Sequence, residues 1–216
     1  QCLVGSEMCI RDRNLDEIVE YRGVTDLVVA EVLSDNNKEG EGYKTGEVYE
    51  LAGVGEISKS TSNSSESKYY NNMAAIVINS VGADEIKCST SVLPLDKLAF
   101  ITGQDYDETT GTLIEGERKT KYFALGYKTK KTNGDEVYVW RHKGTFSIPD
   151  STHATENDGT DSNGQEVTYT GISTTHKFTK TGKTAKAINV DLSKVLADVS
   201  TFFDTVTTID TLKAKA

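Results

Sequence analysis

The chain has 216 residues and carries 24 Lys and Arg against 33 Asp and Glu, a formal net charge of −9. It contains no run of about 18 consecutive apolar residues, the length that a membrane-spanning helix needs, so no membrane partner is expected. The excess of acidic residues argues against a protein that grips nucleic acid, because phosphate binding requires a positive surface. Eighteen glycines against two prolines, with many Thr, Val, Ile and Tyr, indicate strands joined by glycine and asparagine turns.

Residues 1–13 do not resemble the rest of the chain. Residues 2–12 read CLVGSEMCIRD, and the end of a common transposase recognition sequence encodes the MCIRD at residues 8–12. The preceding residues match adaptor bases read in the same frame. We therefore interpret residues 1–13 as an artefact derived from a sequencing adaptor and exclude them from fold reasoning. Cys88 is then the remaining cysteine, and its expected role is that of a small buried hydrophobe.

The first part of the chain predicts two strands and a long polar segment. Residues 24–33 (VTDLVVAEVL) are rich in β-branched side chains, which favours a strand. Residues 34–46 are polar, and residues 47–58 form a second candidate strand interrupted by glycines. Residues 59–72 (KSTSNSSESKYYNN) lack apolar periodicity, so we expect an exposed loop or hairpin tip there.

The centre of the chain predicts two short strands followed by a helix. Residues 73–79 and 84–93 are candidate strands around a turn at residues 81–84, and the second shows the apolar–polar alternation of a half-buried strand. Residues 94–103 (PLDKLAFITG) predict a helix, because proline suits the first turn and glycine suits the end. A polar, turn-rich segment follows at residues 104–118.

The clearest local signal in the sequence is a β-hairpin. Residues 121–131 and 136–147 are strong candidate strands, and the TNGD at residues 132–135 contains the Asn-Gly pair typical of a hairpin turn. Residues 149–165 then form a long acidic loop. Residues 166–179 alternate apolar and polar side chains and predict a further strand.

The C-terminal part of the chain has a different periodicity. Apolar residues recur there at intervals of three and four, which predicts an amphipathic helix over about residues 192–206 with Asp191 as its cap. The side chains expected to form its packing face are Leu192, Val195, Leu196, Val199, Phe202 and Phe203. The chain therefore divides into a β domain at residues 14–189 and a C-terminal helix and tail at residues 190–216.

No pattern in the sequence predicts a catalytic, cofactor-binding or metal site. His142, His153 and His176 do not stand at metal-ligand spacing from one another or from cysteine. Residues 157–166 are acidic, but they lack the residue order of a calcium-binding loop. Because the sequence also lacks the common nucleotide-binding and nucleophile motifs, we expect a protein without cofactors that is not an enzyme.

Several segments, taken together, carry a resemblance to a known family. They are residues 20–24 (EYRGV), 93–95 (LPL), 106–115 (YDETTGTLIE), 122–131 (YFALGYKTKK) and 138–144 (YVWRHKG), then Gly171, Ile172 and Phe178. Their order and spacing across nearly the whole chain from residue 14 resemble the major tail protein of long-tailed bacteriophages, the type found in phages and prophages of Gram-positive bacteria. The adaptor-like start and the C-terminal helix depart from that pattern.

The resemblance implies a mainly β fold, a β-sandwich or barrel packed against one short α-helix, here with an additional C-terminal helix. It implies a structural virion protein, a homo-hexamer whose rings stack into the hollow tail tube, the conduit for genome ejection. Neighbouring subunits would extend one another's sheets, and the tube protein of type VI secretion looks related in fold. Ring closure would also pair strand edges that are otherwise open to aggregation.

The resemblance also implies partners and a location. The first partner is the chain itself, and the others are the tail-tip initiator, the tape-measure protein and the tail-terminator protein. DNA would pass through the lumen without specific binding, because an acidic wall repels phosphate. The subunit would be assembled in the cytoplasm of the bacterial host and reside in the virion tail.

Two segments are candidates for contacts between subunits. The polar segment at residues 59–72 is a hypothetical bridge between stacked rings, against the alternative of a plain surface loop. The residues that would carry this contact are Lys59, Ser62, Asn63, Ser65, Lys68, Tyr69 and Tyr70. The C-terminal helix is expected to pack either across a ring neighbour or on its own core.

A different class of function is the main alternative. A Thr-, Asn- and Gly-rich composition with aromatic residues at Tyr69 and Tyr70 also suits an adhesin-like or carbohydrate-binding β-sandwich module. The absence of a recognisable export signal and the hairpin-and-helix pattern favour the tail-tube interpretation over this one.

Overall fold

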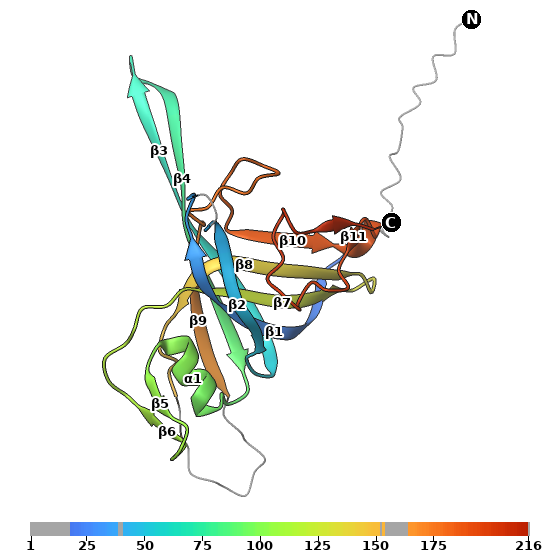
Figure 1. Cartoon of the computed structure of the whole chain (residues 1–216). Helices are drawn as coiled ribbons and strands as arrows, with labels where there is room; N and C mark the ends of the chain where they lie inside the picture. The colour runs from blue at the N-terminus through green and yellow to red at the C-terminus, as the bar shows by residue number, and fades with distance from the viewer. Residues whose placement is uncertain (1–17, 39–40, 152, 154–163, 216) are drawn as a thin grey trace, which may run out of the picture.

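The computed structural model describes residues 18–38, 41–151, 153 and 164–215. These residues form a mainly antiparallel β structure in which α1 (Leu95–Thr102) is the one α-helix (Figure 1). Residues 1–13, interpreted as adaptor-derived, and residues 157–163 of the acidic loop lie outside the described residues. The expected mainly β fold with one short helix is confirmed.

Eight strands make up one large antiparallel sheet. Seven of them follow the order β2-β1-β7-β8-β9-β4-β3, and the eighth, β10, pairs with β8. Their bounds are β1 Tyr21–Asp35, β2 Tyr43–Glu50, β3 Val54–Tyr70, β4 Met73–Thr90, β7 Phe123–Lys131, β8 Glu136–Phe146, β9 Gln165–Ile172 and β10 Ala187–Asp191. The strong hairpin predicted around Asn133 and Gly134 is β7–β8, and it is confirmed.

The sheet curls because its two end strands are consecutive in the chain. Only residues 51–53 connect β2, at one end of the sheet, to β3, at the other end. The backbone N–H of Leu51 donates to the carbonyl of Leu27 in β1 at 2.9 Å, which holds the two ends together at this point. From there β1 and β3 diverge, so the ends of the sheet approach each other without pairing.

Alternate residues of the central strands supply two separate cores. In β1, Leu27 and Val29 belong to the core inside the curl, whereas Val28 and Ala30 belong to the core on its outer face. Successive side chains of a strand point to opposite faces, so a strand covered on both faces reads as a continuous apolar run. The apolar run predicted as a strand at residues 24–33 is explained by this double burial.

The C-terminal segment covers the outer face of the sheet, but it is not an α-helix. Asp191 does cap a turn, η2 (Leu192–Lys194), yet that 3₁₀ turn ends at Val195, whose φ is 47°. A short strand, β11 (Ala197–Asp198), follows and pairs with β12 (Lys213–Ala214). The predicted amphipathic helix over residues 192–206 is therefore wrong.

Hydrogen bonds within this segment, and one from β8, replace the helical pattern. The carboxylate of Asp198 accepts from the N–H of Ser200 at 3.0 Å, and the Phe202 carbonyl accepts from Trp140 Nε1 at 2.8 Å and from Thr207 Oγ1 at 3.0 Å. Side chains that bind nearby backbone groups compete with the helical hydrogen-bond ladder. The apolar spacing reflects contacts with the sheet instead.

The predicted packing face of the C-terminal helix is accordingly divided. Leu192, Val199, Phe202 and Phe203 pack in the outer core, but Val195 and Leu196 are exposed. The sequence predicts that this segment packs either across a ring neighbour or on its own core. The described residues show it packed on its own core.

The helix α1 ends as its sequence predicts. Gly103 adopts a φ of 72°, and its N–H donates to the Ala99 carbonyl at 2.9 Å. A Cβ at this position would lie 2.0 Å from the Lys119 carbonyl oxygen, so both the conformation and the space require glycine. The helix lies at the lower end of the body, together with the small hairpin of β5 (Asp105–Asp107) and β6 (Thr112–Ile114) (Figure 1). Both of these strands lie within the polar segment predicted at residues 104–118.

Two other segments differ from their predictions. Residues 59–72, expected to form a loop or a hairpin tip, lie mostly within β3, and only Asn71 and Asn72 form the tip. The two strands predicted at residues 73–79 and 84–93 form one continuous strand, β4, that passes through Gly82 without turning. Cross-strand pairing with a long partner overrides the weak strand propensity of serine and asparagine.

Candidate assembly surface

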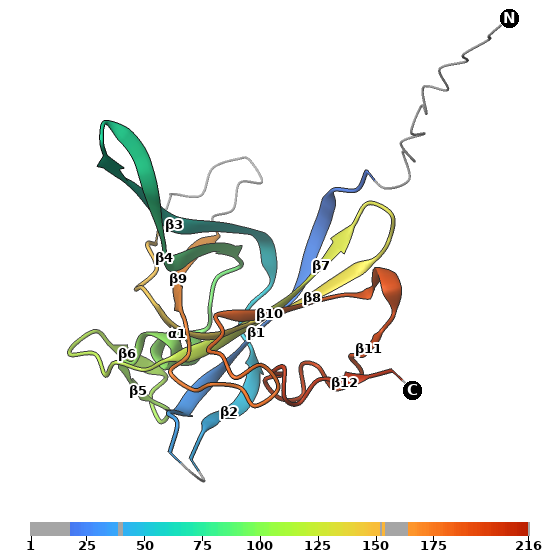
Figure 2. The same ribbon diagram turned by 90° about the horizontal axis from the view of Figure 1, so that it is seen from above.

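The β3–β4 hairpin leaves the body of the molecule at Asp84. β9 pairs with β4 only from Asp84 to Thr90, whereas β3 and β4 stay paired as far as Tyr70 and Met73. The hairpin beyond this point projects away from the other elements as a two-stranded extension (Figure 1). We call residues 62–82 the arm. Figure 2, the view from above, shows the arm on one side of the molecule and the β7–β8 turn on the other.

Two asparagines close the tip of the arm. Asn71 and Asn72 both have positive φ, 51° and 62°, between the last paired residues of β3 and β4. A two-residue turn with both central residues in the left-handed region matches the right-handed twist of a hairpin, and asparagine tolerates that region better than most residues. The arm is therefore a hairpin that stays paired up to its tip, with shifts of register between Thr61 and Asn63 and between Lys68 and Tyr69.

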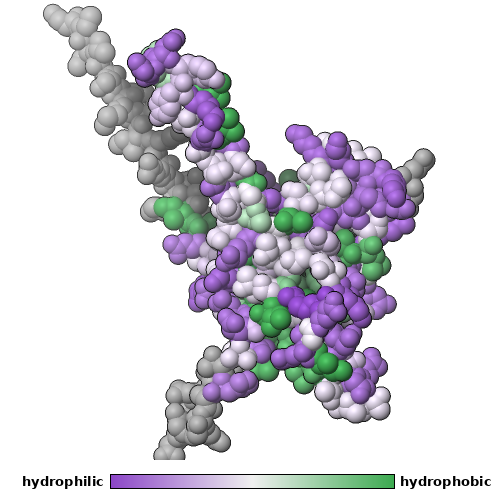
Figure 3. Space-filling model, turned by 90° about the vertical axis from the view of Figure 1, so that its left-hand side faces the viewer, coloured by the Kyte–Doolittle hydropathy of each residue, from purple (hydrophilic) through white to green (hydrophobic). Residues whose placement is uncertain are grey.

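The two strands of the arm differ in chemistry. The β3 strand is rich in serine, whereas the β4 strand begins MAAIVI, and apolar side chains lie along one side of the arm in Figure 3. The large hydrophobic side chains of the arm are each half or more exposed: Tyr69, Tyr70, Met73, Ile76, Val77, Ile78 and Val81. Such a concentration of exposed apolar side chains marks an interaction surface.

Both edges of the arm are open. Among the described residues, β3 ends the sheet and pairs with β4 alone, and β4 has no partner on its other side between Met73 and Ala83. Each edge therefore presents backbone N–H and C=O groups that a further strand could pair with. The arm combines these open edges with exposed apolar side chains.

A buried charge cluster anchors the base of the arm. Asp84 is 3% exposed and lies 3.0 Å from Arg141 Nη1, 3.4 Å from Lys186 Nζ and 3.9 Å from Lys59 Nζ. Thr61 Oγ1 also donates to Asp84 at 3.0 Å. A buried carboxylate tolerates desolvation only when it is paired in this way, so the cluster fixes the point from which the arm projects.

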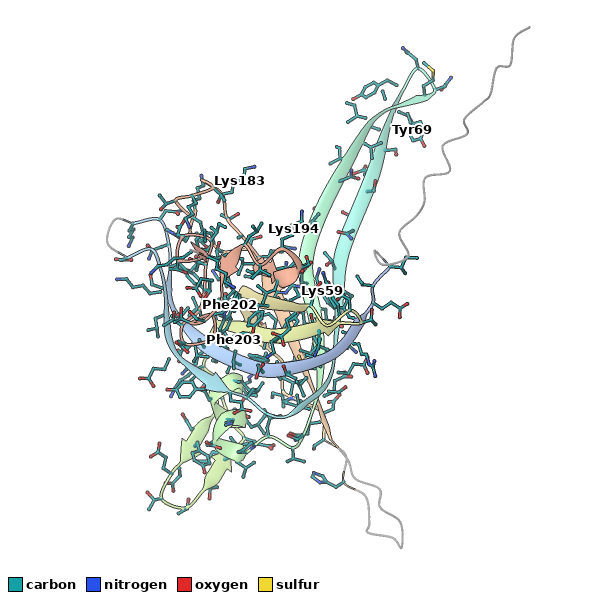
Figure 4. All side chains as sticks on the ribbon, turned by 90° about the vertical axis from the view of Figure 1, so that its right-hand side faces the viewer. Lys59, Tyr69, Lys183, Lys194, Phe202 and Phe203 are labelled. Atoms are coloured by element: carbon teal, nitrogen blue, oxygen red, sulfur yellow. The ribbon has the colours of Figure 1, made fainter. Side chains whose placement is uncertain are left out.

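The predicted inter-ring residues are distributed along the β3 side of the arm and its base. Lys59 lies at the base beside Asp84, and Tyr69 lies near the tip (Figure 4). Ser62, Asn63 and Ser65 lie between them, all exposed or half-exposed, Lys68 forms an ion pair with Glu66, and Tyr70 ends the strand. The structure thus brings these residues onto one extended hairpin and not into one loop.

The apolar half of this surface is absent from the contact residues that the sequence predicts. The sequence places Ile76, Val77 and Ile78 in a strand at residues 73–79, but they are exposed in the arm. The signal that could have identified them is the lack of any alternation in MAAIVI, directly after the polar run at residues 59–72. A strand apolar on both faces must be covered by something on both faces.

Burial is the main cause of the shifted pKa values of His142 and Cys88 in the body. His142 is buried between aromatic rings, and desolvation lowers its pKa to about 4, with the charge of Arg141 acting in the same direction. Burial raises the pKa of the Cys88 thiol to about 12, so the thiolate is scarce at neutral pH. Among the described residues, no group of three His, Cys, Asp or Glu side chains could hold a metal ion.

No protein-family model and no curated protein matches this chain. Within the part of the chain that the structure describes, no helix is both long enough and apolar enough to span a membrane.

Proposed function

We propose that this chain is the major tail protein of a long-tailed bacteriophage, a structural subunit that closes into hexameric rings and stacks them into the tail tube. The observation that supports this proposal best is the arm. A strand such as β4, with Ile76, Val77 and Ile78 exposed and one backbone edge open, invites aggregation in water, and burial in a larger assembly would remove that risk.

The body of the molecule does not need the arm for its own stability. None of the residues of the two hydrophobic cores comes from residues 62–82. The arm therefore costs conformational entropy on folding without contributing core burial. Contacts with neighbouring copies of the chain would supply the compensating burial, as expected of an element selected for assembly.

The charge of the chain suits a conduit for DNA. A net charge of −9 disfavours tight binding of phosphate, so genome DNA would slide past an acidic lumen wall without specific contacts. The proposed location is the virion tail, after assembly in the host cytoplasm. The tail-tip initiator, the tape-measure protein and the tail-terminator protein are the proposed partners besides the chain itself.

Two matched valine substitutions test the role of the arm. Val77 and Val92 are both exposed, 56% and 64%, but only Val77 lies in the arm. We expect Val77→Lys to prevent rings or tubes, because it places a charge on the surface that assembly buries, and Val92→Lys to assemble like the unsubstituted chain. Negative-stain electron microscopy of concentrated protein, with a light-scattering mass, measures both.

The outcomes separate the proposal from its main alternative. Tubes with a central hole from the unsubstituted chain, and monomers from Val77→Lys, would support it. Normal tubes from Val77→Lys would contradict the role of the arm. A chain that stays monomeric at high concentration and binds a sugar on a glycan array would favour the carbohydrate-binding module instead.

A further inference from the structure

A groove opens where the curled sheet fails to close. It lies between the first half of β1 and the first half of β3 and has a volume of about 490 Å³. Val24 and Ile57 line its two sides, and Val137 and Val139 of β8 line its floor. The groove is therefore mainly apolar and continuous with the core inside the curl.

Two polar atoms of the groove lack hydrogen-bond partners among the described residues. Arg141 Nε and Thr129 Oγ1 are both buried, and both residues line the groove. Arg141 is 7% exposed and pairs with Asp84 through Nη1. The Nε–H of an arginine can only donate, so it requires an acceptor, and a carboxylate is the acceptor that a guanidinium binds best.

The surrounding charges favour an anionic group as well. Arg141 and Lys59 line the groove, and Lys186 lies 3.4 Å from Asp84 behind them. Glu56 at the edge is the acidic residue among those lining the groove. The three cations are thus opposed by two acids, Glu56 and Asp84. This leaves one positive charge in excess beside an apolar surface.

The backbone on each side of the groove is also available. β1 pairs with β2 only from Val28 onward, and β3 pairs only with β4. Within the part of the chain that the structure describes, the groove-facing edges of both strands thus lack a strand partner along the groove. An extended segment could bind there by its main chain as well as by its side chains.

We infer that this groove receives the Ile114 and Glu115 end of the β5–β6 hairpin from a second copy of the chain, an inference that rests on the proposed assembly. Ile114 is 56% exposed, and Glu115 is exposed without an ion-pair partner among the described residues. An apolar side chain followed by a carboxylate matches the apolar floor of the groove and its cations, of which Lys59 is the accessible one, with 39% of its side chain exposed.

The positions of the two surfaces require two molecules. The β5–β6 hairpin lies at the lower end of the body, whereas Lys59 of the groove lies by the base of the arm (Figure 4). One copy cannot place its own hairpin in its own groove. A contact between different surfaces of identical subunits is head-to-tail, and it repeats from copy to copy along a stack.

A cysteine pair tests the contact directly. Full-length chains carrying Ile57→Cys and Ile114→Cys are assembled, treated with a short bismaleimide and digested, and cross-linked peptides are identified by mass spectrometry. We expect a peptide that joins residues 57 and 114 of different copies. The control pair is Ile57→Cys with Leu196→Cys, because Leu196 is 69% exposed but lies in the C-terminal segment that covers the outer face of the sheet. Single-cysteine chains give the background from the native cysteines.

A charge exchange gives an independent measurement. Lys59→Glu and Glu115→Lys should each raise the concentration at which assembly begins by about two- to five-fold, the range for a partly exposed ion pair. The double variant should return it toward the original value, because the pair is restored with its signs reversed.

The outcomes distinguish this inference from the proposed function. A 57–114 cross-link together with rescue by the double variant supports the inference. Tubes that form and depend on Val77 but show neither result would overturn it and leave the proposed function standing. Failure of the unsubstituted chain to assemble would overturn both.

Discussion

Glycine at position 126 is required by a tryptophan on the neighbouring strand. A Cβ there would lie 2.8 Å from Val28 Cγ2 and 2.9 Å from the ring of Trp140. Trp140 is fully buried and packs on the outer face of the sheet, where Phe203 lies against it. Because Gly126 has no side chain, the indole ring of Trp140 can pack directly over its backbone.

Replacing this glycine should destabilise the fold. We expect Gly126→Ala to lower the free energy of unfolding by about 1–3 kcal/mol, because the added methyl overpacks a filled core. Gly116→Ala is the control, since a Cβ at Gly116 meets nothing within 4 Å, and it should change stability by less than about 0.5 kcal/mol. Urea unfolding followed by tryptophan fluorescence measures both, and equal effects would contradict the packing argument.

His142 should make the stability of the fold depend on pH. Burial lowers its pKa from 6.5 to about 4, so the unfolded chain binds a proton between these values and the folded chain does not. The stability that is fully present above pH 6.5 is therefore lost as the pH falls toward 4, by about 3 kcal/mol in total.

The measurement for His142 is a comparison of two pH profiles. Unfolding free energies of the unsubstituted chain and of His142→Leu are determined from pH 7.5 to pH 4. The difference between the two curves isolates His142 from the aspartates that titrate at lower pH, such as Asp35, whose pKa is lowered by hydrogen bonds from Lys143 and two backbone N–H groups against opposing desolvation. Parallel curves would refute the assignment.

Among the elements, the C-terminal segment departs furthest from its predicted form. Its apolar residues are spaced as in a helix, yet they reach the sheet from turns and a short strand. Phe202 lies edge-on to Tyr138, and its carbonyl accepts from the Trp140 indole at 2.8 Å. The segment completes the outer core that a single curved sheet leaves uncovered.

Truncation of Phe202 should show that the segment belongs to its own core. We expect Phe202→Ala to cost about 3–5 kcal/mol of stability, as for other buried aromatic residues, because Phe202 is 2% exposed. Leu196→Ala serves as the control, since Leu196 is 69% exposed and should contribute almost nothing. A Phe202→Ala chain that unfolds at the same urea concentration as the parent, while assembling poorly, would instead favour packing across a neighbour.

At the scale of the whole molecule, the body and the arm should differ in dynamics. Amides of the body, such as those of β8, are paired on both sides of the strand, whereas β4 amides in the arm belong to a two-stranded hairpin in water. Local opening is easiest where few buried contacts hold the backbone. The arm should therefore exchange amide hydrogens fast in the monomer.

Hydrogen exchange followed by mass spectrometry compares the monomer with assembled material. We expect peptides covering residues 73–83 to exchange at least about tenfold more slowly after assembly, because a new strand or surface covers them. Peptides from β8 should change little and serve as the internal control. Unchanged exchange of the arm in tubes would show that it is not the contact surface.

The sequence by itself determined the elements whose signals are local. The β7–β8 hairpin follows from Asn133 and Gly134, and α1 follows from Pro94 and Gly103. Proline fixes φ, and glycine adopts the positive φ that a hairpin turn or a helix end needs, as Gly134 and Gly103 do. The mainly β character also follows from composition and alternation. None of these inferences requires knowledge of what lies across the sheet.

The tertiary structure decided the features that depend on distant partners. Ser62 to Tyr70 form a strand because β4 pairs with them, and the apolar spacing after Asp191 serves a sheet face and not a helix. The groove exists because the link at Leu51 joins the two ends of the sheet while β1 and β3 diverge. Local residue patterns carry no information on such long-range pairing, because side chains far apart in the chain create it.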